Sequence, residues 1–418
     1  MKQKKTLGVF SLLIIASLIC NSCNKSNNPA NPNTTGITYD CTTFENITTN
    51  TTLAAGNYNI TCNILVSNYA ILTIAPGATL NFSQGISLTA ELGATINASG
   101  TAAQPIVFKG NGTKGYWNGI TLNNLYSAVS NNNIFSYCTI TDGGGNYFNL
   151  QDYGANITMA NATSAFTNCT ISNSNDVGIY MTGAAPDATV FTAFNNNTLS
   201  GNGTYPLRVN AAGAASLGSA TGNRYSNNTF NYIGLEQENN GGGYDVNVDI
   251  TLKPQPVPYL LIDGTNGIMF NKSFMIAPGT NIIMGSGTSL LITSTGSIDA
   301  RGTSTSPIVI NGYQATAGYW GSIFVESNSA LNTLSYCKIS GGGGAEGLVY
   351  GYGAPYYGLI STYQWAYNNE SVNVTNCTLS NSASSGIYVH PTSGTNLTYN
   401  NDISTANYFS SCNPNVYF

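Results

Sequence analysis

The sequence has very few charged residues. Asp, Glu, Lys and Arg make up 7% of the 418 residues, and there is one histidine; an average globular protein has roughly 25% charged residues. Hydrophobic residues still reach 42%, which excludes the disordered composition that combines low hydrophobicity with high charge. The net charge of −5 is spread along the chain. No basic patch therefore indicates nucleic acid or an anionic membrane surface as a partner.

Long hydrophobic runs are also missing. The longest run, residues 7–19, has about 13 residues, too few to cross a bilayer core of ~30 Å as a helix. A cluster of lysines at positions 2, 4 and 5 precedes it, which is typical of a signal peptide. Segments rich in Ala, Glu, Lys and Leu are absent after this run, so we expect no helices in the mature chain.

The end of this leader resembles a bacterial lipoprotein signal. Ser22 stands directly before Cys23, and an Asn/Ser/Pro-rich stretch follows. We therefore predict that Cys23 carries the lipid, that residues 1–22 are the signal peptide and that residues 23–36 form a disordered tether. Ordinary secretion with cleavage before Asn24 is the alternative. The lipid would be the chain's only attachment to an outer membrane, and the tether does not decide between surface and periplasmic display.

Metal-ligand spacing is missing downstream of Cys23. Seven of the nine cysteines follow it, none of them in a CxxC pair or beside the histidine. An odd number cannot all pair within the chain. Four recur in one repeated context, and a cysteine that recurs in one strand register is expected to be a small buried hydrophobe: Cys138, Cys169, Cys337 and Cys377. We predict no metal and no cofactor.

The chain contains a long internal repeat. The segment that starts at Thr73-Ile74-Ala75-Pro76-Gly77 returns as Met275-Ile276-Ala277-Pro278-Gly279, and both copies go on to a Gly-Tyr-Trp triplet and a Tyr-Cys pair. The offset is 202 residues at Thr73 and Met275 and 199 residues at Cys138 and Cys337. Self-similarity over so many positions indicates a duplicated repeat architecture.

A shorter rhythm runs inside each copy. Strand candidates of three to five residues are separated by Gly, Pro, Asn or Ser, for example at residues 71–74, 79–82 and 94–96. Ile74 and Ile96 lie 22 residues apart, about the length of a coil with three short strands. Such a coil buries its apolar side only by stacking on the next. We predict an all-β, right-handed parallel β-helix, the hand following from the crossover bias. An antiparallel sandwich is the runner-up.

The chain resembles bacterial right-handed β-helix repeat proteins in the segments LTIAPGATLNF and GATINASGTAAQPIVFKG. Many proteins of that family are exported or surface lipoproteins. The resemblance covers about residues 58–412. It implies a fold and not a reaction, since the class holds polysaccharide lyases, hydrolases and adhesins. We expect a cap at 37–57 and a solenoid at 58–418, with halves at about 58–240 and 255–412.

Acidic residues are scattered. The best candidate for a paired-carboxylate or cation site is Asp245 with Asp249, which would share one side of a strand, together with Glu236 and Glu238. Arg208, Arg224 and Lys253 could join them from neighbouring coils. A solvated strand face is the favoured alternative, and His390 is interpreted as a surface residue because no carboxylate is adjacent to orient it.

Aromatic residues gather after the Gly341–Gly344 run, where Gly and Tyr alternate. Tyr and Trp on a loop offer stacking surface for sugar rings, so these are the predicted ligand-binding residues, with burial against the solenoid flank as the favoured alternative: Tyr350, Tyr352, Tyr356, Tyr357, Tyr363 and Trp365. Trp117 and Trp320 occupy equivalent repeat positions and are expected to be structural.

Three interpretations follow from these features. The leading one is an envelope or cell-surface lipoprotein with a structural, adhesive or glycan-binding role, possessing no evident catalytic constellation. The alternative is a polysaccharide lyase or glycoside hydrolase built on the β-helix, with Asp245 and Asp249 as catalytic candidates. A separate, third interpretation is a modular fragment of a larger adhesion or nutrient-capture assembly. A polysaccharide or surface glycan is the expected partner, and the sequence gives no oligomeric state.

Overall fold

The chain divides into two compact units, residues 1–35 and Gly36–Phe418. In this computed structural model, the described residues all belong to the second unit. They are 37–38, 41, 45–125, 127, 131–145, 154–182, 190–218, 222–236, 245–262, 267–344, 358–362, 370–389, 398–399 and 402–418. The predicted signal peptide, Cys23 and the tether lie outside them. Within the described ranges, no helix is long and apolar enough to cross a membrane.

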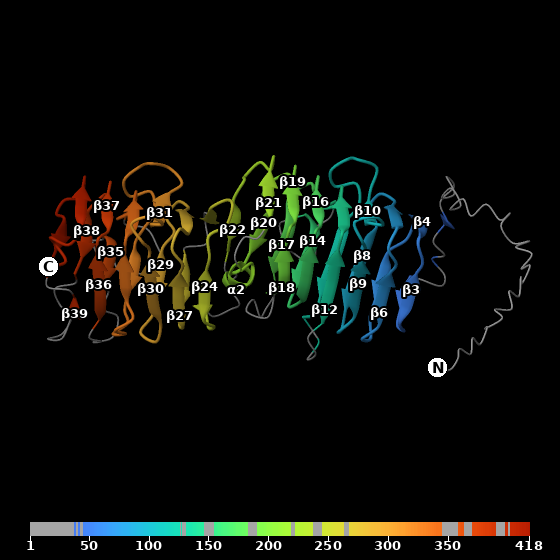
Figure 1. The fold of residues 1–418 in the computed structure, drawn as a ribbon, viewed down its shortest axis with the longest axis horizontal. Coiled ribbons are helices and arrows are strands. Elements are labelled where there is room, and N and C mark those ends of the chain that lie inside the picture. Colours follow the sequence, from blue (N-terminus) through green and yellow to red (C-terminus); the bar gives the residue numbers. More distant parts are fainter. Residues whose placement is uncertain are drawn as a thin grey trace, which may run out of the picture. The chain divides into compact units, whose positions relative to one another are not determined.

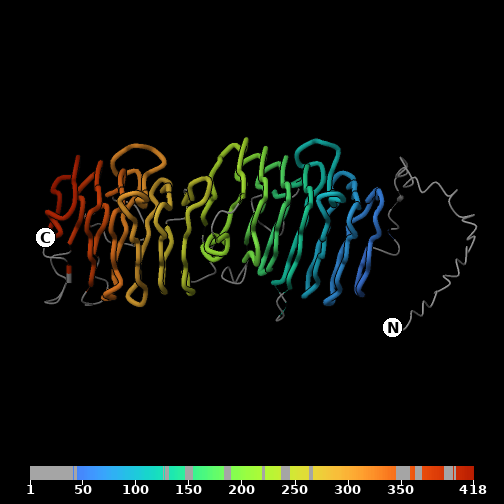
Figure 2. The backbone as a smooth tube through the Cα atoms, viewed as in Figure 1, coloured from blue at the N-terminus to red at the C-terminus, as the bar shows by residue number. Residues whose placement is uncertain are grey.

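Short strands build the second unit, and their side chains alternate between core and surface. In the strand Ala78–Phe82, Ala78, Leu80 and Phe82 are buried, whereas Thr79 and Asn81 face outward. Most strands pair in parallel with the strand three places further along the chain, whereas Thr198–Ser200 and Leu207–Val209 pair with the second strand after them. The coil of three strands is therefore as predicted, and Figures 1 and 2 show the coils stacked side by side. The parallel pairing excludes the antiparallel sandwich.

Sheets A, B and C begin in the first copy, and sheet B alone continues through both. Sheet A contains β1 (Ile37–Thr38), β4 (Gly56–Ile60), β7 (Ala78–Phe82), β10 (Ile106–Lys109), β13 (Cys138–Thr141), β16 (Thr170–Ser172), β19 (Thr198–Ser200) and β21 (Arg224–Ser226). Sheet B contains β2 (Asn46–Ile47), β5 (Ile64–Val66), β8 (Ser87–Glu91), β11 (Gly119–Asn123), β14 (Ala155–Ala160), β17 (Val177–Thr182), β20 (Leu207–Val209), β22 (Ile233–Leu235), β25 (Tyr259–Leu261), β28 (Asn281–Met284), β31 (Ile308–Gly312), β34 (Cys337–Ser340), β37 (Thr378–Ser380) and β40 (Tyr408–Ser410).

The other three sheets are each confined to one copy. Sheet C contains β3 (Thr51–Leu53), β6 (Ile71–Ile74), β9 (Thr95–Ser99), β12 (Asn132–Ser136), β15 (Thr163–Thr167) and β18 (Val190–Asn195). Sheet D contains β23 (Asp245–Val246), β26 (Ile268–Phe270), β29 (Leu290–Ile292), β32 (Ile323–Val325), β35 (Gly358–Thr362), β38 (Ser385–Tyr388) and β41 (Val416–Tyr417). Sheet E contains β24 (Ile250–Leu252), β27 (Ser273–Ile276), β30 (Ser297–Arg301), β33 (Thr333–Ser335), β36 (Ser371–Thr375) and β39 (Thr398–Tyr399).

Residues 37–57, predicted as a cap, hold β1, β2 and β3. These strands pair with β4, β5 and β6, one in each sheet. The coil pairing therefore starts before Tyr58, the predicted first residue of the solenoid.

The two copies are out of phase by one strand. Sequence-equivalent strands β7 and β28 lie in sheets A and B respectively, and β8 and β29 lie in sheets B and D. A short helix, α2 (Ala211–Ser216), takes the place of one strand after β20 and contacts both β18 and β24. After α2, β21 and β22 still continue sheets A and B, and from β23 onward the strands that alternate with sheet B belong to sheets D and E. The expectation of no helix was wrong here, because a six-residue helix capped by Asn210 is too short to give a helical pattern.

The core is continuous from the first to the last coil. Phenylalanines stack along it: the rings of Phe135 and Phe166 are 5.0 Å apart and 6° from parallel. Buried asparagines satisfy backbone groups at the corners, since Asn197 accepts from Cys169 N and Asn223 accepts from Asn197 N, both at 2.9 Å. Cys138, Cys169, Cys337 and Cys377 are at most 2% exposed and belong to this core, as predicted.

Candidate functional site

The equivalent tryptophans are structural. Trp117 and Trp320 are both 0% exposed. Their indole N–H groups donate to the carbonyl oxygens of Thr141 and Ser340, at 2.7 Å and 2.9 Å. They sit in the connections β10–β11 and β31–β32, which form matching teal and orange arches in Figure 2. A buried indole with a satisfied N–H fixes this corner in each copy and leaves no ring for a ligand.

The predicted carboxylate pair does not share a strand. Asp245 lies in β23, which ends at Val246, and the chain turns before β24 begins at Ile250. Asp249 is exposed in this turn, where its carboxylate accepts from Ser273 N at 3.0 Å. The prediction of one shared face was wrong because a two-residue strand and a corner replace the five-residue strand assumed.

The basic residues named with that pair are dispersed as well. Arg224 is exposed in sheet A, beside Thr198. Lys253 follows β24, and its carbonyl accepts from the Tyr259 hydroxyl at 2.9 Å. Glu238 and His390 lie outside the described residues. Glu236 has another partner, described next.

One charged cluster does form, on the outer side of sheet B. Arg208 stands between the core residues Leu207 and Val209 and points outward. Its Nε donates to Glu236 Oε2 at 2.5 Å, with the two side chains 6% and 20% exposed. Nearby, the Thr204 hydroxyl donates to the Asp176 carboxylate. Burial raises the pKa of Asp176, while the Thr204 hydrogen bond and the Arg208 charge oppose that rise.

This Arg208 cluster (Asp176, Thr204, Arg208 and Glu236) is tied into the sheet. Arg208 is in register with Tyr180 on one side and Gly234 on the other, and Tyr180 is 1% exposed. A Cβ at Gly234 would lie 2.8 Å from Ile262 Cδ1, so a larger side chain there would displace Ile262. A nearly buried arginine whose charge is matched by Glu236 is arranged to hold neighbouring coils together.

A second pair of acids lies in the second copy, at the corner between sheets D and E. Glu326 follows β32 directly, and Glu370 directly precedes β36. Backbone bonding brings these places together, since Ser371 N donates to Ser327 O at 2.9 Å. Glu370 is 0% exposed. Burial, and then the charge of Glu370, raise the pKa of Glu326 to about 7.

The predicted aromatic ligand residues lie outside the described residues, but the chain order gives their attachment. Tyr350, Tyr352, Tyr356 and Tyr357 fall in residues 345–357, between β34 and β35, whereas Tyr363 and Trp365 fall in residues 363–369, between β35 and β36. Both segments are thus continuous with β35. Glu370 is the first described residue after the second segment.

One row of in-register side chains on the outer face of sheet D, called the outward row, includes a residue of β35. In register from the first strand to the last, it contains Asp245, Met269, Leu291, Phe324, Ser361, Tyr388 and Tyr417. Phe324 and Leu291 are 2% and 8% exposed although they point away from the coil core. The rings of Tyr388 and Tyr417 stack at 5.1 Å. Sheet D therefore carries a second, smaller layer of apolar and aromatic side chains outside the main core.

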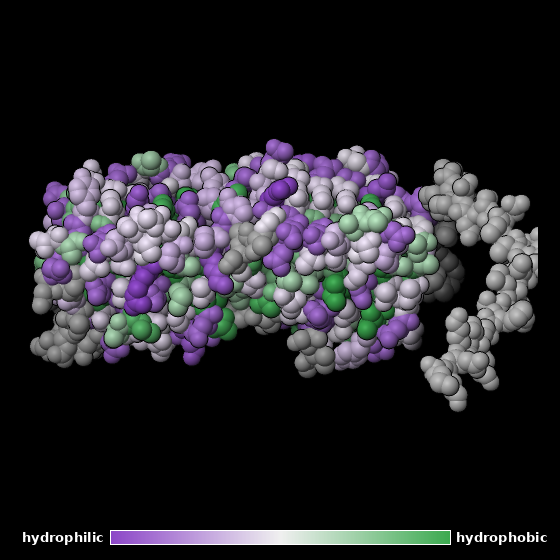
Figure 3. All heavy atoms as spheres, in the orientation of Figure 1, coloured by the Kyte–Doolittle hydropathy of each residue, from purple (hydrophilic) through white to green (hydrophobic). Residues whose placement is uncertain are grey.

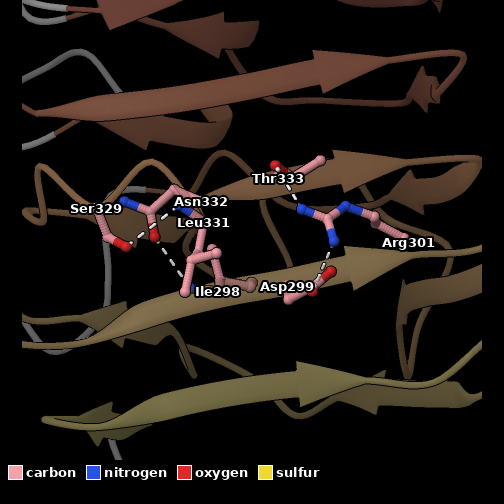
Figure 4. A network of polar contacts seen from close by, with 7 residues as sticks. All are labelled: Ile298, Asp299, Arg301, Ser329, Leu331, Asn332 and Thr333. Atoms are coloured by element: carbon pink, nitrogen blue, oxygen red, sulfur yellow. Dashed lines mark hydrogen bonds and ion pairs between the residues drawn. The ribbon is translucent and has the colours of Figure 1, made fainter.

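Sheet E presents a polar face instead. Figure 4 shows Arg301 reaching from β30 to Asp299 and to Thr333 of the next coil. The Arg301–Asp299 ion pair measures 2.9 Å, and the arginine side chain is 52% exposed, so the pair adds little stability. Asn332 accepts from Ile298 N at 2.9 Å and fixes the neighbouring corner. Over the visible face, hydrophilic and hydrophobic residues are intermixed (Figure 3).

Comparison with known proteins supports the fold. A family model described as a pectate-lyase-like β-helix domain matches residues 45–147. No curated protein and no solved structure matched the chain. Within the described parts of the chain, no group of three or more His, Cys, Asp or Glu side chains is arranged to hold a metal ion.

Sequence reasoning missed the Glu326–Glu370 pair. The two residues are 44 positions apart in the chain, so only the coil register brings them together. A signal did exist in the repeat itself. Ala162, which directly precedes β15, is the equivalent of Glu370 and is buried in the core. A glutamate in place of a core alanine marks a position where the second copy has departed from its scaffold role.

Proposed function

We propose that this chain is an exported envelope lipoprotein, anchored through Cys23, that binds a glycan at the segments flanking β35. The observation that carries the proposal is the attachment of both aromatic segments to one strand of sheet D. Tyr and Trp rings stack well on sugar faces, and a β-helix strand is a rigid base for such loops. The outward row of the same sheet, with Phe324 and Tyr388 on the strands next to β35, is also apolar and aromatic.

A glycan array with the full mature chain, followed by affinity measurement on the best ligand, tests this function. Trp365→Ala and Tyr356→Ala are expected to weaken binding about tenfold or more each, the usual cost of truncating a central aromatic anchor. Tyr408→Ala is the matched control, because Tyr408 is 66% exposed on β40 in sheet B. Absence of any glycan ligand, or an equal loss in the control, would refute the proposal.

A second candidate is hydrolysis of a polysaccharide, favoured by the Glu326–Glu370 pair. A carboxyl group with a pKa near 7 is suited to general acid catalysis at neutral pH, and Glu326 has that property. Release of reducing ends from the bound polysaccharide would support this candidate if Glu326→Gln lowered the rate at least a hundredfold with binding intact. Binding without turnover in the unmodified chain would leave the binding role alone.

A further inference from the structure

Two pairs of thiols occupy equivalent places in the two copies. Cys138 begins β13, and Cys169 directly precedes β16; the register Thr139–Thr170 sets the two cysteines side by side on neighbouring coils. Cys337 and Cys377 have the same relation through the register Lys338–Thr378. All four are at most 2% exposed.

The two thiols of each pair are in contact. The two cysteines of each pair shift one another's pKa, and Cys337 N donates to Cys377 Sγ at 3.4 Å. Neighbouring parallel strands are ~4.8 Å apart, inside the Cα separation of ~4.4–6.8 Å that a disulfide needs. The Cβ atoms of two in-register residues on neighbouring strands are also about as far apart as the strands, ~4.8 Å. Most disulfides have a Cβ–Cβ distance of ~3.8 Å, so a disulfide here would be strained and more easily reduced.

The chain already joins neighbouring coils in this way. Cys41 and Cys62 form a disulfide with a Cα separation of 5.9 Å, and the strands that follow them, β2 and β5, are paired neighbours in sheet B. The dithiol state is also well accommodated: Cys138 Sγ donates to Ala98 O at 3.2 Å and Cys337 Sγ to Ala300 O at 3.3 Å. The dithiol state therefore fits the core, and the spacing of neighbouring strands permits a disulfide.

We propose that Cys138–Cys169 and Cys337–Cys377 are dithiol couples that oxidise to disulfides and so link adjacent coils when the chain folds in an oxidising compartment. Each couple loses two electrons and two protons to a disulfide oxidant, whose own S–S bond is reduced to two thiols, while one S–S bond forms between the coils. Oxidation takes place before the coils close. After closure, all four cysteines are at most 2% exposed, so an oxidant no longer reaches their thiols.

Peptide mapping of the full chain tests the proposal. The chain is produced once by export into an oxidising compartment and once in a reducing cytosol, then unfolded in guanidinium chloride with an alkylating agent and digested. The exported sample is expected to yield peptides joined through Cys138–Cys169 and through Cys337–Cys377, with none of these four cysteines alkylated. The cytosolic sample is expected to yield the four alkylated cysteines.

The second pair serves as a control for the first. Cys138→Ser should leave Cys169 alkylated and the Cys337–Cys377 link intact, and Cys412→Ser should change neither link. The Cys41–Cys62 peptide in the same exported sample shows that oxidation took place. Recovery of that peptide with Cys138, Cys169, Cys337 and Cys377 all alkylated would overturn the proposal, as would links between other partners. Neither result depends on whether the chain binds a glycan.

Discussion

Replacing Glu326 by glutamine should stabilise the protein in a pH-dependent way. The ordinary pKa of a glutamate is 4.5, and burial together with Glu370 raises that of Glu326 to about 7. The folded state therefore holds the proton more tightly than the unfolded chain. The stability that this difference contributes is complete below pH 4.5 and is lost as the pH rises through 7.

The size of the effect follows from the same two values. At ~1.4 kcal/mol for each pH unit, the interval from 4.5 to about 7 corresponds to an upper limit of about 3.5 kcal/mol. Glu326 is only partly buried, so solvent screening reduces the expected effect to about 1–2 kcal/mol. Glutamine has nearly the same shape and carries no charge at any pH, so Glu326→Gln removes the loss at high pH.

Urea unfolding followed by circular dichroism at pH 5 and pH 8 measures this. Glu326→Gln is expected to unfold at a higher urea concentration than the unmodified chain at pH 8 and to show at most a small difference at pH 5. Glu45→Gln is the matched control, since Glu45 is exposed near the first coil, and it should not change the pH dependence. A stabilisation of equal size at both pH values, or a destabilisation at pH 8, would refute the reasoning.

Three further substitutions test the packing and the polar contacts. Phe166→Ala, which removes a 0% exposed ring stacked on Phe135, should lower the free energy of unfolding by about 3–5 kcal/mol in urea; a loss below 1 kcal/mol would contradict the ring stack. Asn197→Ala removes the acceptor of Cys169 N and should cost about 1–3 kcal/mol, with faster hydrogen exchange at Cys169. Arg208→Met leaves the Glu236 carboxylate without its 2.5 Å ion pair and should cost about 3–5 kcal/mol; Arg208→Met with Glu236→Gln should recover most of this, and full additivity of the two changes in thermal unfolding would show that the pair does not interact.

The three-strand coil of the β-helix could be predicted from the sequence, because its apolar alternation and corner residues recur along the chain. Short apolar alternations such as residues 71–74 became β6 as expected, because two-residue periodicity and corner residues are local signals. The corners agree as well: Asn168 and Asn376 adopt positive φ values of 55° and 56° at equivalent places, a conformation that asparagine tolerates. The coil length then fixed which strands are neighbours.

The candidate sites could not be predicted in the same way. The partners of Arg208 and Glu326 come from other coils, 28 residues away for Glu236 and 44 residues away for Glu370. A shift of one residue in a corner moves such a side chain to the opposite face of its strand. The Asp245–Asp249 prediction failed for this reason, since a corner at residues 247–249 separates two short strands that the sequence pattern did not distinguish from one.

The one-strand shift between the copies decides which surfaces are unique. The equivalents of sheet A strands lie in sheet B in the second copy, as β7 and β28 do. The outward row of sheet B consequently runs from Tyr180 and Arg208 to Ile283 and Asn311, without repeating itself. A duplicated sequence thus gives a duplicated core and two different exteriors. Positions where the copies agree, such as Trp117 and Trp320, hold the scaffold, and function is to be sought where they differ, as at Ala162 and Glu370.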